Sequence, residues 1–392
     1  MHYRILTLNS ISPRGLARFP PQHYQLGSEL AEPDAILLRS AELQAGAVGA
    51  TVRAVARAGA GVNNIPVQQL ARRGVPVFNA PGANANAVKE LVIAGLLLAA
   101  RNIAPAWLFA RALEGDDAAI AAQVEAGKKR FVGFELPGRT LGVVGLGAIG
   151  VEVANSALAL GMKVLGYDPQ LTVERAWQLS SSAEQARSLE DLCARADAVT
   201  VHVPLNAATT GLVNGARLQL MKPQTILLNF ARAQIVAETA VLAALDAGRL
   251  HAYVCDFPNA ALKSHPRVVA LPHLGASTAE AEDNSAVMVA EQLRDFLENG
   301  NIRNSVNYPE AVLARVPNTT RLAIANSNVP NMVGQISTCL AGAGLNIADL
   351  LNKSRGEYAY TLIDAEGVVS ATLLERIRAI DGVLSARVIE AA

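Results

Sequence analysis

The sequence predicts an α/β protein with two doubly wound parallel-sheet (Rossmann-like) domains and a C-terminal ferredoxin-like βαββαβ domain. Short apolar runs alternate with helical patterns over the first 283 residues, which is typical of parallel sheets covered by helices. A glycine-rich turn, Gly145-x-Gly147-x-x-Gly150, lies between one such run and a helical pattern. The last 75 residues follow the order strand, helix, strand, strand, helix, strand.

Four apolar runs at the start of the chain are expected to be strands of one parallel sheet. A helix from about Ala85 to Arg101 follows them, and a second helix, about Thr278 to Glu298, is amphipathic. We expect residues 1–104 and 284–304 to form this domain, with the two helices acting as a hinge to the next one. The expected strands are Ile5–Leu8, Ala35–Leu38, Val52–Ala56 and Val75–Phe78.

Six further apolar runs are expected to form the sheet of a second domain, residues 105–283. The expected strands are Leu141–Val144, Lys163–Tyr167, Ala198–Val203, Thr225–Asn229, His251–Val254 and Val268–Ala270.

A third domain is expected over residues 318–392. Asn299-Gly300-Asn301 stops the amphipathic helix, and the polar segment 305–317, with its two prolines, is expected to be a linker. The expected elements are strand Arg321–Ala325, helix Pro330–Ala343, strands Asn346–Ser354 and Glu357–Asp364, helix Ser370–Ile380 and strand Val383–Ile389.

Length and composition limit the domain number and the partners. A chain of 392 residues, 51% hydrophobic and 17% charged, is expected to form two or three domains with sizeable cores. Its 34 basic and 34 acidic residues cancel, so no net field favours nucleic acid or a membrane surface. The three cysteines match no metal-ligand spacing, and no apolar run suits a signal peptide or a membrane span. We therefore expect a soluble, cytoplasmic protein with free thiols, no bound metal, and neither nucleic acid nor membrane as a partner.

The glycine-rich turn predicts a dinucleotide site. Gly145 permits the tight turn, Gly147 lets the backbone approach a pyrophosphate, and Gly150 lets the helix pack on the strand. The helix N-terminus offers free N–H groups to the phosphates. Asp168 ends the next strand, 18 positions after the last glycine, where it would bind a ribose diol and repel a 2′-phosphate. The predicted cofactor is therefore NAD rather than NADP; a glycine-rich turn of some other βαβ unit is the alternative.

Seven segments together resemble one enzyme family. Their order and spacing are similar to those of the D-isomer-specific 2-hydroxyacid dehydrogenases, in the phosphoglycerate-oxidising branch with a C-terminal ACT domain, over nearly the whole chain. The segments are the glycine-rich turn, Arg39-Ser40, Gly59–Ile65, Phe78–Pro81 with Asn84, His202–Pro204, Asn229–Arg232 and Pro272–Ser277.

The resemblance implies NAD-dependent oxidation of 3-phospho-D-glycerate to 3-phosphohydroxypyruvate, the first step of a phosphorylated route to L-serine. A hydride leaves C2 of the substrate, and the hydroxyl proton passes to a base. Histidine suits a base that works near neutral pH, and His273 matches the family's catalytic histidine. A guanidinium binds carboxylates bidentately, and Arg232 matches the residue that holds the substrate carboxylate.

Two positions depart from the family's pattern. The family completes its catalytic set with a glutamate that pairs with the histidine and raises the histidine pKa, and the matching residue here is Ala260. Asp256, four residues earlier, is the nearest carboxylate and is expected to replace the glutamate; Glu280 and Glu282 are weaker alternatives. Ala233 stands where relatives usually have glycine beside the arginine.

By the same resemblance, further residues are expected to contact the cofactor and the substrate. The expected NAD contacts are Gly145, Gly147, Ala148, Ile149, Gly150, Asp168, His202, Val203, Pro204, Ala231, Arg232, Asp256, His273 and Gly275. The expected contacts of the phosphorylated 2-hydroxy acid are Arg39, Ser40, Gly61, Val62, Asn84, Lys128 and Arg130. The basic run at 128–130 sometimes approaches a neighbouring subunit's site in relatives, and a solvated surface is an equal alternative.

The third domain resembles an ACT domain, which binds amino acids at a domain–domain interface. Asn326, Asn328 and Asn346 match its loops, and asparagine amides can hold both charged groups of a zwitterion such as L-serine. A structural, dimerising tail is the alternative. The expected assembly is a homodimer or homotetramer.

Two other functions stay open. Another D-2-hydroxyacid dehydrogenase would act on 2-hydroxyglutarate, glycerate or lactate. A non-catalytic NAD-binding sensor on the same fold would explain the missing glutamate, whereas the presence of His273 and Arg232 argues against it.

Overall fold

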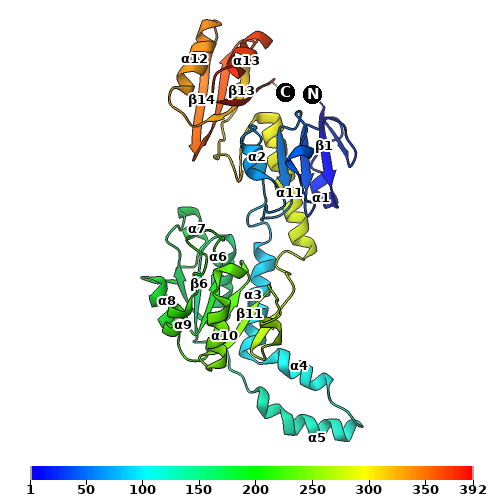
Figure 1. Ribbon diagram of the computed structural model, residues 1–392, viewed down its shortest axis with the longest axis vertical. Helices are drawn as coiled ribbons and strands as arrows, with labels where there is room; N and C mark the ends of the chain where they lie inside the picture. Colours follow the sequence, from blue (N-terminus) through cyan, green and yellow to red (C-terminus); the bar gives the residue numbers. More distant parts are fainter. Residues whose placement is uncertain (1, 391–392) are drawn as a thin grey trace. The chain divides into compact units, whose positions relative to one another are not determined.

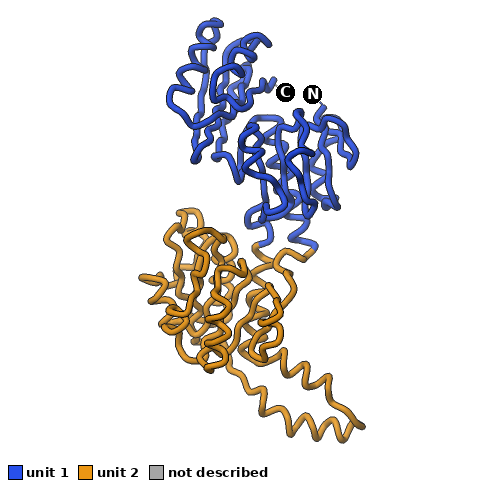
Figure 2. Tube along the Cα trace, in the orientation of Figure 1, with its two compact units in different colours: residues 1–84, 279–392 blue, residues 85–278 orange. Residues whose placement is uncertain are grey.

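The chain divides into two compact units, each built on a parallel sheet. The computed structural model describes residues 2–390. Unit 1 comprises residues 1–84 and 279–392, and unit 2 comprises residues 85–278 (Figures 1 and 2). The predicted α/β class, with two parallel sheets and a small antiparallel sheet at the C-terminal end, is confirmed.

The unit boundaries differ from those expected at 104/105 and 283/284. Helix α3 (Ala85–Ala100) belongs to unit 2, because its buried side chains, among them Val92 and Leu96, share a core with β-strand residues of that unit. Helix α11 (Ala279–Asn299) lies in unit 1 from its first residue, with Val289 and Leu293 in the unit 1 core. Each helix thus packs on a single unit.

The first sheet of unit 1 is parallel, with strand order β2-β1-β3-β4-β5. In β3, Ala35 and Leu37 face the core shared with α11, while Ile36 and Leu38 face the core on the other side, so both faces of the sheet are covered. Strand β2 was not predicted. The strands are β1 (Tyr3–Leu8), β2 (Tyr24–Gly27), β3 (Ala35–Leu38), β4 (Ala54–Arg57) and β5 (Val77–Phe78), and the short helices are α1 (Pro13–Leu16) and α2 (Val67–Ala71).

The second sheet of unit 1 is antiparallel, with order β14-β15-β13-β16, which confirms the predicted βαββαβ sequence of elements. Helices α12 and α13 pack on one face through residues such as Ile336 and Ile377. The opposite face, including Tyr360 and Leu362, joins the core of the first sheet. The elements are β13 (Thr319–Ser327), α12 (Met332–Gly342), β14 (Asn346–Arg355), β15 (Tyr358–Glu366), α13 (Ala371–Arg378) and β16 (Val383–Ile389).

The segment expected to be a linker is docked on the first sheet. Asn307 accepts a hydrogen bond from the Val77 amide at 2.8 Å and donates one to the Val75 carbonyl at 3.0 Å. Tyr308 is fully buried, and its hydroxyl donates to the Ala71 carbonyl at 2.7 Å. These bonds attach the segment to β5 and its surroundings, so the segment is part of the folded unit.

The sheet of unit 2 is parallel throughout, with order β12-β11-β10-β9-β6-β7-β8. Buried side chains form a core on each of its faces. The strands are β6 (Thr140–Val144), β7 (Lys163–Tyr167), β8 (Glu184–Gln185), β9 (Ala198–Val201), β10 (Thr225–Asn229), β11 (Leu250–Cys255) and β12 (Val268–Ala270). The helices that follow the strands are α6 (Ala148–Ala159), α7 (Val173–Gln178), α8 (Leu189–Arg195), α9 (Gly215–Leu220) and α10 (Glu238–Asp246).

Two helices that were not predicted extend away from the sheet of unit 2 (Figure 1). They are α4 (Ile103–Arg111) and α5 (Asp117–Gly127), followed by the short helix η2 (Lys128–Phe131). Trp107 and Leu108 on α4 are 57% and 61% exposed. Within residues 2–390, no single helix is long and apolar enough to cross a membrane, although α3 and α4, bent by 69°, pass that test as a pair.

Candidate active site

The glycine-rich turn between β6 and α6 has the close backbone packing that a dinucleotide site requires. Gly145 has a φ of +90°, and a Cβ there would lie 2.8 Å from the His202 carbonyl oxygen. A Cβ at Gly150 would lie 1.9 Å from the Gly145 carbonyl oxygen, so only glycine allows this contact. A Cβ at Gly147 would meet nothing within 4 Å. The middle of the turn therefore faces open space, where a pyrophosphate can approach the backbone.

This turn lies where the strand order reverses. Strands β7 and β8 extend to one side of β6, and β9 to β12 extend to the other. In parallel α/β sheets, ligands bind beyond the carboxyl ends of the strands at such a switch point.

Asp168 follows β7, the strand beside β6, and its carboxylate is held in place by the backbone. One oxygen accepts the Leu146 amide at 2.8 Å and the other accepts the Gln170 amide at 2.8 Å. Each carboxylate oxygen can accept a second hydrogen bond. Asp168 is therefore oriented to accept bonds from a ribose diol.

His202 and Val203 follow β9 on the other side of the switch point. The Val203 side chain would lie 2.9 Å from a Cβ at Gly145, so it packs directly against the turn. A ring nitrogen of His202 lies 2.9 Å from the Thr200 hydroxyl. Burial lowers the pKa of His202 to about 4, so its imidazole is neutral at pH 7 and contributes shape and a hydrogen bond rather than charge.

Three expected catalytic residues follow three neighbouring parallel strands. Arg232 comes after β10, Asp256 directly after β11, and His273 after β12. Asn229, the last residue of β10, fixes the turn that carries Arg232: its amide donates to the Arg232 carbonyl at 3.0 Å, and its carbonyl accepts the Ala231 amide at 3.1 Å. The guanidinium donates to the Ala231 carbonyl at 2.6 Å and, among the described residues, forms no ion pair. Its remaining donors are available for a carboxylate.

Asp256 is buried, and few polar partners compensate its carboxylate for the loss of water. It is 1% exposed, and neither carboxylate oxygen forms a hydrogen bond of ordinary geometry within residues 2–390. Burial raises the pKa of Asp256, and this rise is opposed by His273, by Arg232 and by nearby backbone amides, including that of Gly275. Arg232 and His273 therefore lie close enough to act electrostatically on this carboxylate.

His273 lies on the exposed loop after β12. Its ring packs against Phe257, with 5.3 Å between the ring centroids and a 60° angle between the planes. Ala260, the position of the family's glutamate, is exposed on the loop after β11. Asn259 anchors that loop by donating to Glu238 at 2.6 Å and accepting the amides of the residues that follow. The loop is thus ordered, but its Ala260 side chain is a methyl group that cannot pair with an imidazole.

The expected substrate residues of unit 1 gather at the carboxyl edge of its first sheet. Arg39 and Ser40 follow β3, Gly61 and Val62 follow β4, and Asn84 follows β5. The Arg39 guanidinium donates to Glu282 of α11 at 2.5 Å, and both side chains are more than a third exposed. Glu282, one of the weaker alternatives for the family's glutamate, is therefore paired with Arg39.

Arg57 is a charged residue of this edge that the sequence analysis missed. It ends β4, and its guanidinium donates to the Gly61 carbonyl at 2.7 Å, which shapes the loop that carries Gly61 and Val62. Asn84 places a buried side-chain oxygen there without a hydrogen-bond partner within residues 2–390.

The basic side chains of η2 contact residues of the same η2 helix and of the neighbouring helices α4 and α5. Lys128 pairs with Glu125, one helical turn earlier. The Arg130 guanidinium lies 4.6 Å from the Phe109 ring centroid and 5.5 Å from that of Phe131. The residues therefore stabilise the α4–α5 arm, defined here as residues 103–131.

The three expected effector residues donate their amides within the C-terminal domain. Asn326 lies on β13 and is 1% exposed, so its side chain is buried within the domain. The acceptors are the Ser327 carbonyl for Asn326, the Gly356 carbonyl for Asn328 and the Glu366 carboxylate for Asn346. A bound amino acid would have to replace some of these bonds.

Comparison with known proteins identifies the family. Residues 97–275 match the family model described as "D-isomer specific 2-hydroxyacid dehydrogenase, NAD binding domain". The D-3-phosphoglycerate dehydrogenase of Haemophilus influenzae is 34% identical over 343 residues, which cover 84% of this chain and 79% of that protein. The chain belongs to the D-isomer-specific 2-hydroxyacid dehydrogenases. It is accordingly an NAD-dependent enzyme that acts on a small molecule.

Other members of the family differ from this chain in length. The D-3-phosphoglycerate dehydrogenase of Methanocaldococcus jannaschii is 34% identical over 351 residues, but the chain spans only 63% of its length. An NAD+-bound 3-phosphoglycerate dehydrogenase structure from Entamoeba histolytica matches with a TM-score of 0.60 at 23% identity, covering 78% of this chain and 99% of that one. This likeness shows the fold of the 2-hydroxyacid dehydrogenases.

The switch-point geometry fits NAD. The open face of Gly147 would admit the pyrophosphate, the N–H groups of Ala148 and Ile149 begin the helix behind it, and Asp168 would bind the adenosine ribose.

Proposed function

We propose that this dehydrogenase oxidises 3-phospho-D-glycerate to 3-phosphohydroxypyruvate and so opens a phosphorylated route to L-serine. The observation that carries the proposal is the placement of Arg232, Asp256 and His273 at the carboxyl ends of three neighbouring strands in the NAD-binding unit. Relatives that are 33–37% identical, all named D-3-phosphoglycerate dehydrogenase, support the choice of substrate.

In this mechanism, Arg232 binds the substrate carboxylate and polarises the C2 oxygen as it becomes a carbonyl. Its planar fork suits a carboxylate, and its backbone is fixed by Asn229. His273 takes the proton of the C2 hydroxyl as the C2–H bond breaks. NAD, when bound, supplies the acceptor for the departing hydride. One proton and one hydride thus leave the alcohol, which becomes a ketone.

Asp256 takes the place of the family's glutamate. An ionised carboxylate near His273 attracts the positive charge that the ring carries once it has accepted the substrate's proton. Burial strengthens this interaction, because little water reaches the carboxylate to screen its charge. Asp256 acts through His273, so it is a positioning residue.

The test is the oxidation of NADH by the purified chain with 3-phosphohydroxypyruvate, with 2-oxoglutarate and pyruvate as competing substrates. We expect turnover to be fastest with 3-phosphohydroxypyruvate. We expect His273→Gln to lower turnover by about a hundredfold or more while NADH binding stays unchanged. Faster turnover of an unphosphorylated oxo acid would assign a different 2-hydroxy acid.

A non-catalytic NAD sensor is the second candidate, and the methyl group of Ala260 favours it. The same assay separates the two functions. A sensor would bind NADH yet reduce none of the three oxo acids, and Ala260→Glu would then be expected to create turnover. Turnover in the unaltered chain excludes the sensor.

We also propose that the α4–α5 arm joins copies of the chain. Trp107 and Leu108 on the arm are 57% and 61% exposed, and Val132, directly after the arm, is 76% exposed. Large exposed apolar side chains of this kind are typical of a surface that is covered in an assembly. Light scattering after gel filtration should give a dimer or tetramer. Trp107→Glu with Leu108→Glu should shift it toward the monomer, whereas Arg187→Glu, on an exposed loop, should not.

For the C-terminal domain, we propose regulation by an amino acid, with L-serine as the first probe. The asparagine amides of its loops support this proposal, since they can be exchanged for the charged groups of a zwitterion. L-Serine should slow NADH oxidation, and Asn346→Ala should weaken that inhibition. Equal rates with and without L-serine would favour a structural domain.

A further inference from the structure

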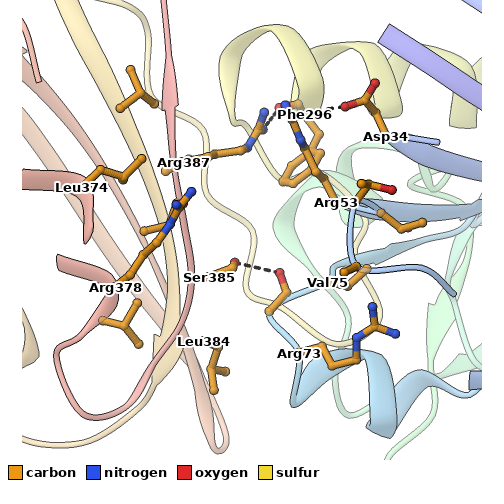
Figure 3. Close-up of a pocket in the computed structure, with 18 of the residues that line it drawn as sticks. Asp34, Arg53, Arg73, Val75, Phe296, Leu374, Arg378, Leu384, Ser385 and Arg387 are labelled. Atoms are coloured by element: carbon orange, nitrogen blue, oxygen red, sulfur yellow. Dashed lines mark hydrogen bonds and ion pairs between the residues drawn. The ribbon is translucent and has the colours of Figure 1, made fainter. Parts of the chain in front are cut away.

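A cavity of about 1020 Å³ lies in unit 1 between β16 and the first parallel sheet. Figure 3 shows Arg378, Ser385 and Arg387 on one side of it and Arg53 and Arg73 on the other. The two sides are joined where the Ser385 hydroxyl donates to the Gly74 carbonyl at 3.1 Å.

This cavity is at the opposite edge of the sheet from the substrate residues. Its lining residues Asp34, Arg53 and Val75 precede strands β3, β4 and β5, whereas Arg39 and Gly61 follow β3 and β4. A four-residue strand separates the two edges by roughly 13 Å at 3.3 Å per residue. The cavity is thus distinct from the site proposed for the substrate.

The lining carries an excess of positive charge. Five arginines against two carboxylates leave a net three positive charges. Arg53 pairs with Asp34 at 3.3 Å and Arg378 with Glu375 at 2.7 Å. The remaining arginines, Arg4, Arg73 and Arg387, form no ion pair with any carboxylate within residues 2–390.

Two of the unpaired arginines are held in place by backbone carbonyls. Arg73 donates to the carbonyls of Val48 and Gly49, at 2.8 Å each. Arg387 donates to the Leu297 carbonyl at 3.1 Å, and its guanidinium lies 4.4 Å from the centroid of the Phe296 ring. Burial lowers the pKa of Arg387, although a guanidinium keeps its charge in proteins. A partly buried, oriented cation without a counter-ion favours the binding of an anion.

We propose that this cavity binds an organic phosphate, which bridges Arg378 and Arg387 of the C-terminal domain to Arg53 and Arg73 of the first sheet. A phosphate ester concentrates about 1.5 to 2 negative charges in one group near pH 7, which suits converging guanidinium forks better than a single carboxylate does. The volume is at the upper end of the range of about 300–1,000 Å³ for small-molecule sites, so it exceeds the needs of inorganic phosphate.

The apolar part of the lining indicates where the organic part of the ligand would lie. Leu374 and Leu384 flank the arginines on the side of the C-terminal domain (Figure 3). The ligand would tie β16 to the amino ends of the strands whose carboxyl ends carry Arg39 and Gly61.

The test is isothermal titration of the full chain, saturated with NADH, with ATP, inorganic triphosphate and citrate as probes. Saturation with NADH keeps nucleotides from the switch-point site. Arg73→Gln and Arg378→Gln remove one cation from each side of the cavity. Arg72→Gln and Arg376→Gln are matched controls, because these neighbouring arginines are exposed and do not line the cavity.

We expect ATP to bind, each cavity variant to weaken it about tenfold or more, and each control to change it less than twofold. Inorganic triphosphate should bind more weakly and depend on the same arginines. ATP should also slow hydrogen exchange at residues 383–389, and this protection should be lost in Arg73→Gln, whose substitution lies outside that strand.

Three results would overturn the proposal. The first is no binding of ATP, and the second is binding that the cavity variants leave unchanged. The third is tighter binding of triphosphate or citrate than of ATP, which would assign an inorganic phosphate or a polycarboxylate instead. If Arg378→Gln fails to fold, Arg73→Gln alone decides between these outcomes.

Discussion

Two regions of the molecule bury an aspartate, and they treat it in opposite ways. In the C-terminal sheet, Asp364 is fully buried and receives two hydrogen bonds from Arg321, each 2.7 Å long, and one from the Val316 amide at 2.9 Å. After β11 of the NAD-binding unit, Asp256 is 1% exposed and forms no ordinary hydrogen bond within residues 2–390. The carboxylate is paired with an arginine in the C-terminal sheet, whereas burial leaves it with a raised pKa in the NAD-binding unit.

The difference separates structure from chemistry. Arg321 also donates to the carbonyls of Asn299, Leu313 and Ala314, so the pair with Asp364 fastens the segment before β13 to the sheet. A buried carboxylate with no such partners lowers stability, and such costs are typical of sites where a reaction uses the charge. Asp364 therefore belongs to the architecture, and Asp256 to the proposed active site.

Of the variants considered, removal of the Asp364 partner should cause the largest loss of unfolding free energy. Arg321→Met would leave the buried carboxylate of Asp364 without its cation and should cost about 3–5 kcal/mol of unfolding free energy. Thermal and urea unfolding of the full chain, followed by circular dichroism, measure this loss. A loss below about 1 kcal/mol would mean that water or a rearranged side chain replaces Arg321.

Asp256→Asn should have the opposite balance, with a large loss of turnover and no loss of stability. We expect turnover to fall about ten- to a hundredfold, because the charge that supports His273 is lost. Steady-state kinetics and melting temperature, measured on the same sample, separate the two effects. Unchanged turnover would remove Asp256 from the mechanism.

The stability of Asp256→Asn should depend on pH, because the two buried aspartates differ in how their charge is compensated. Because the folded-state pKa of Asp256 is raised, the stability tied to its protonated form is full below the unfolded pKa of about 3.9 and is lost as pH rises through the folded pKa. Asp256→Asn should therefore gain stability relative to the natural chain at pH 8 but not at pH 4. A loss of stability at pH 8 would show that the carboxylate is compensated after all.

A third aspartate, Asp168, lies between these extremes, since two backbone amides bind it at a partly exposed position. Asp168→Ala should narrow the preference for NADH over NADPH about tenfold, because a charge-assisted bond and a repulsion of the 2′-phosphate are both lost. The ratio of kcat/KM for the two cofactors gives the answer. An unchanged ratio would contradict the assignment of the ribose diol to Asp168.

The smallest effect is expected for an ion pair at the surface of unit 1. Arg303 is 50% exposed and lies 3.3 Å from Asp295. Arg303→Gln should cost less than about 1 kcal/mol, because water screens such a pair. The unfolding free energies of Arg303→Gln and Arg321→Met should be measured together. Both variants break an arginine–aspartate pair, so a larger loss for Arg321→Met would be due to burial.

Much of the fold could be predicted because the pattern of buried strands is local. Strands Ala35–Leu38, Thr225–Asn229 and Val383–Ile389 were expected with the bounds that the structure has. Strand β2 was missed because Tyr24-Gln-Leu-Gly lacks the continuous apolar run of strands such as Ala35–Leu38. The largely apolar sequence of α3 does not reveal which of two sheets it covers, so a unit boundary at residue 84 is not evident from the sequence.

The candidate site was predictable to a different extent. The glycine-rich turn is recognisable from its position between a strand and a helix, and Arg232 and His273 from the resemblance of their segments to those of the family. The isolation of Asp256 is a property of its tertiary surroundings, which no spacing reveals. The arginines of the cavity stand at positions 4, 53, 73, 378 and 387, and only the folded chain brings them together.

The docking of Asn307 and Tyr308 on the first sheet governs how the chain can be shortened. β5 is the last strand of that sheet, and this segment occupies its outer backbone groups. Cutting the chain at residue 304 would bare a strand edge, which invites edge-to-edge association and aggregation. A truncated form intended to stay monodisperse should therefore extend past residue 311, so that Tyr308 and the Ile302–Ala311 pairing are kept.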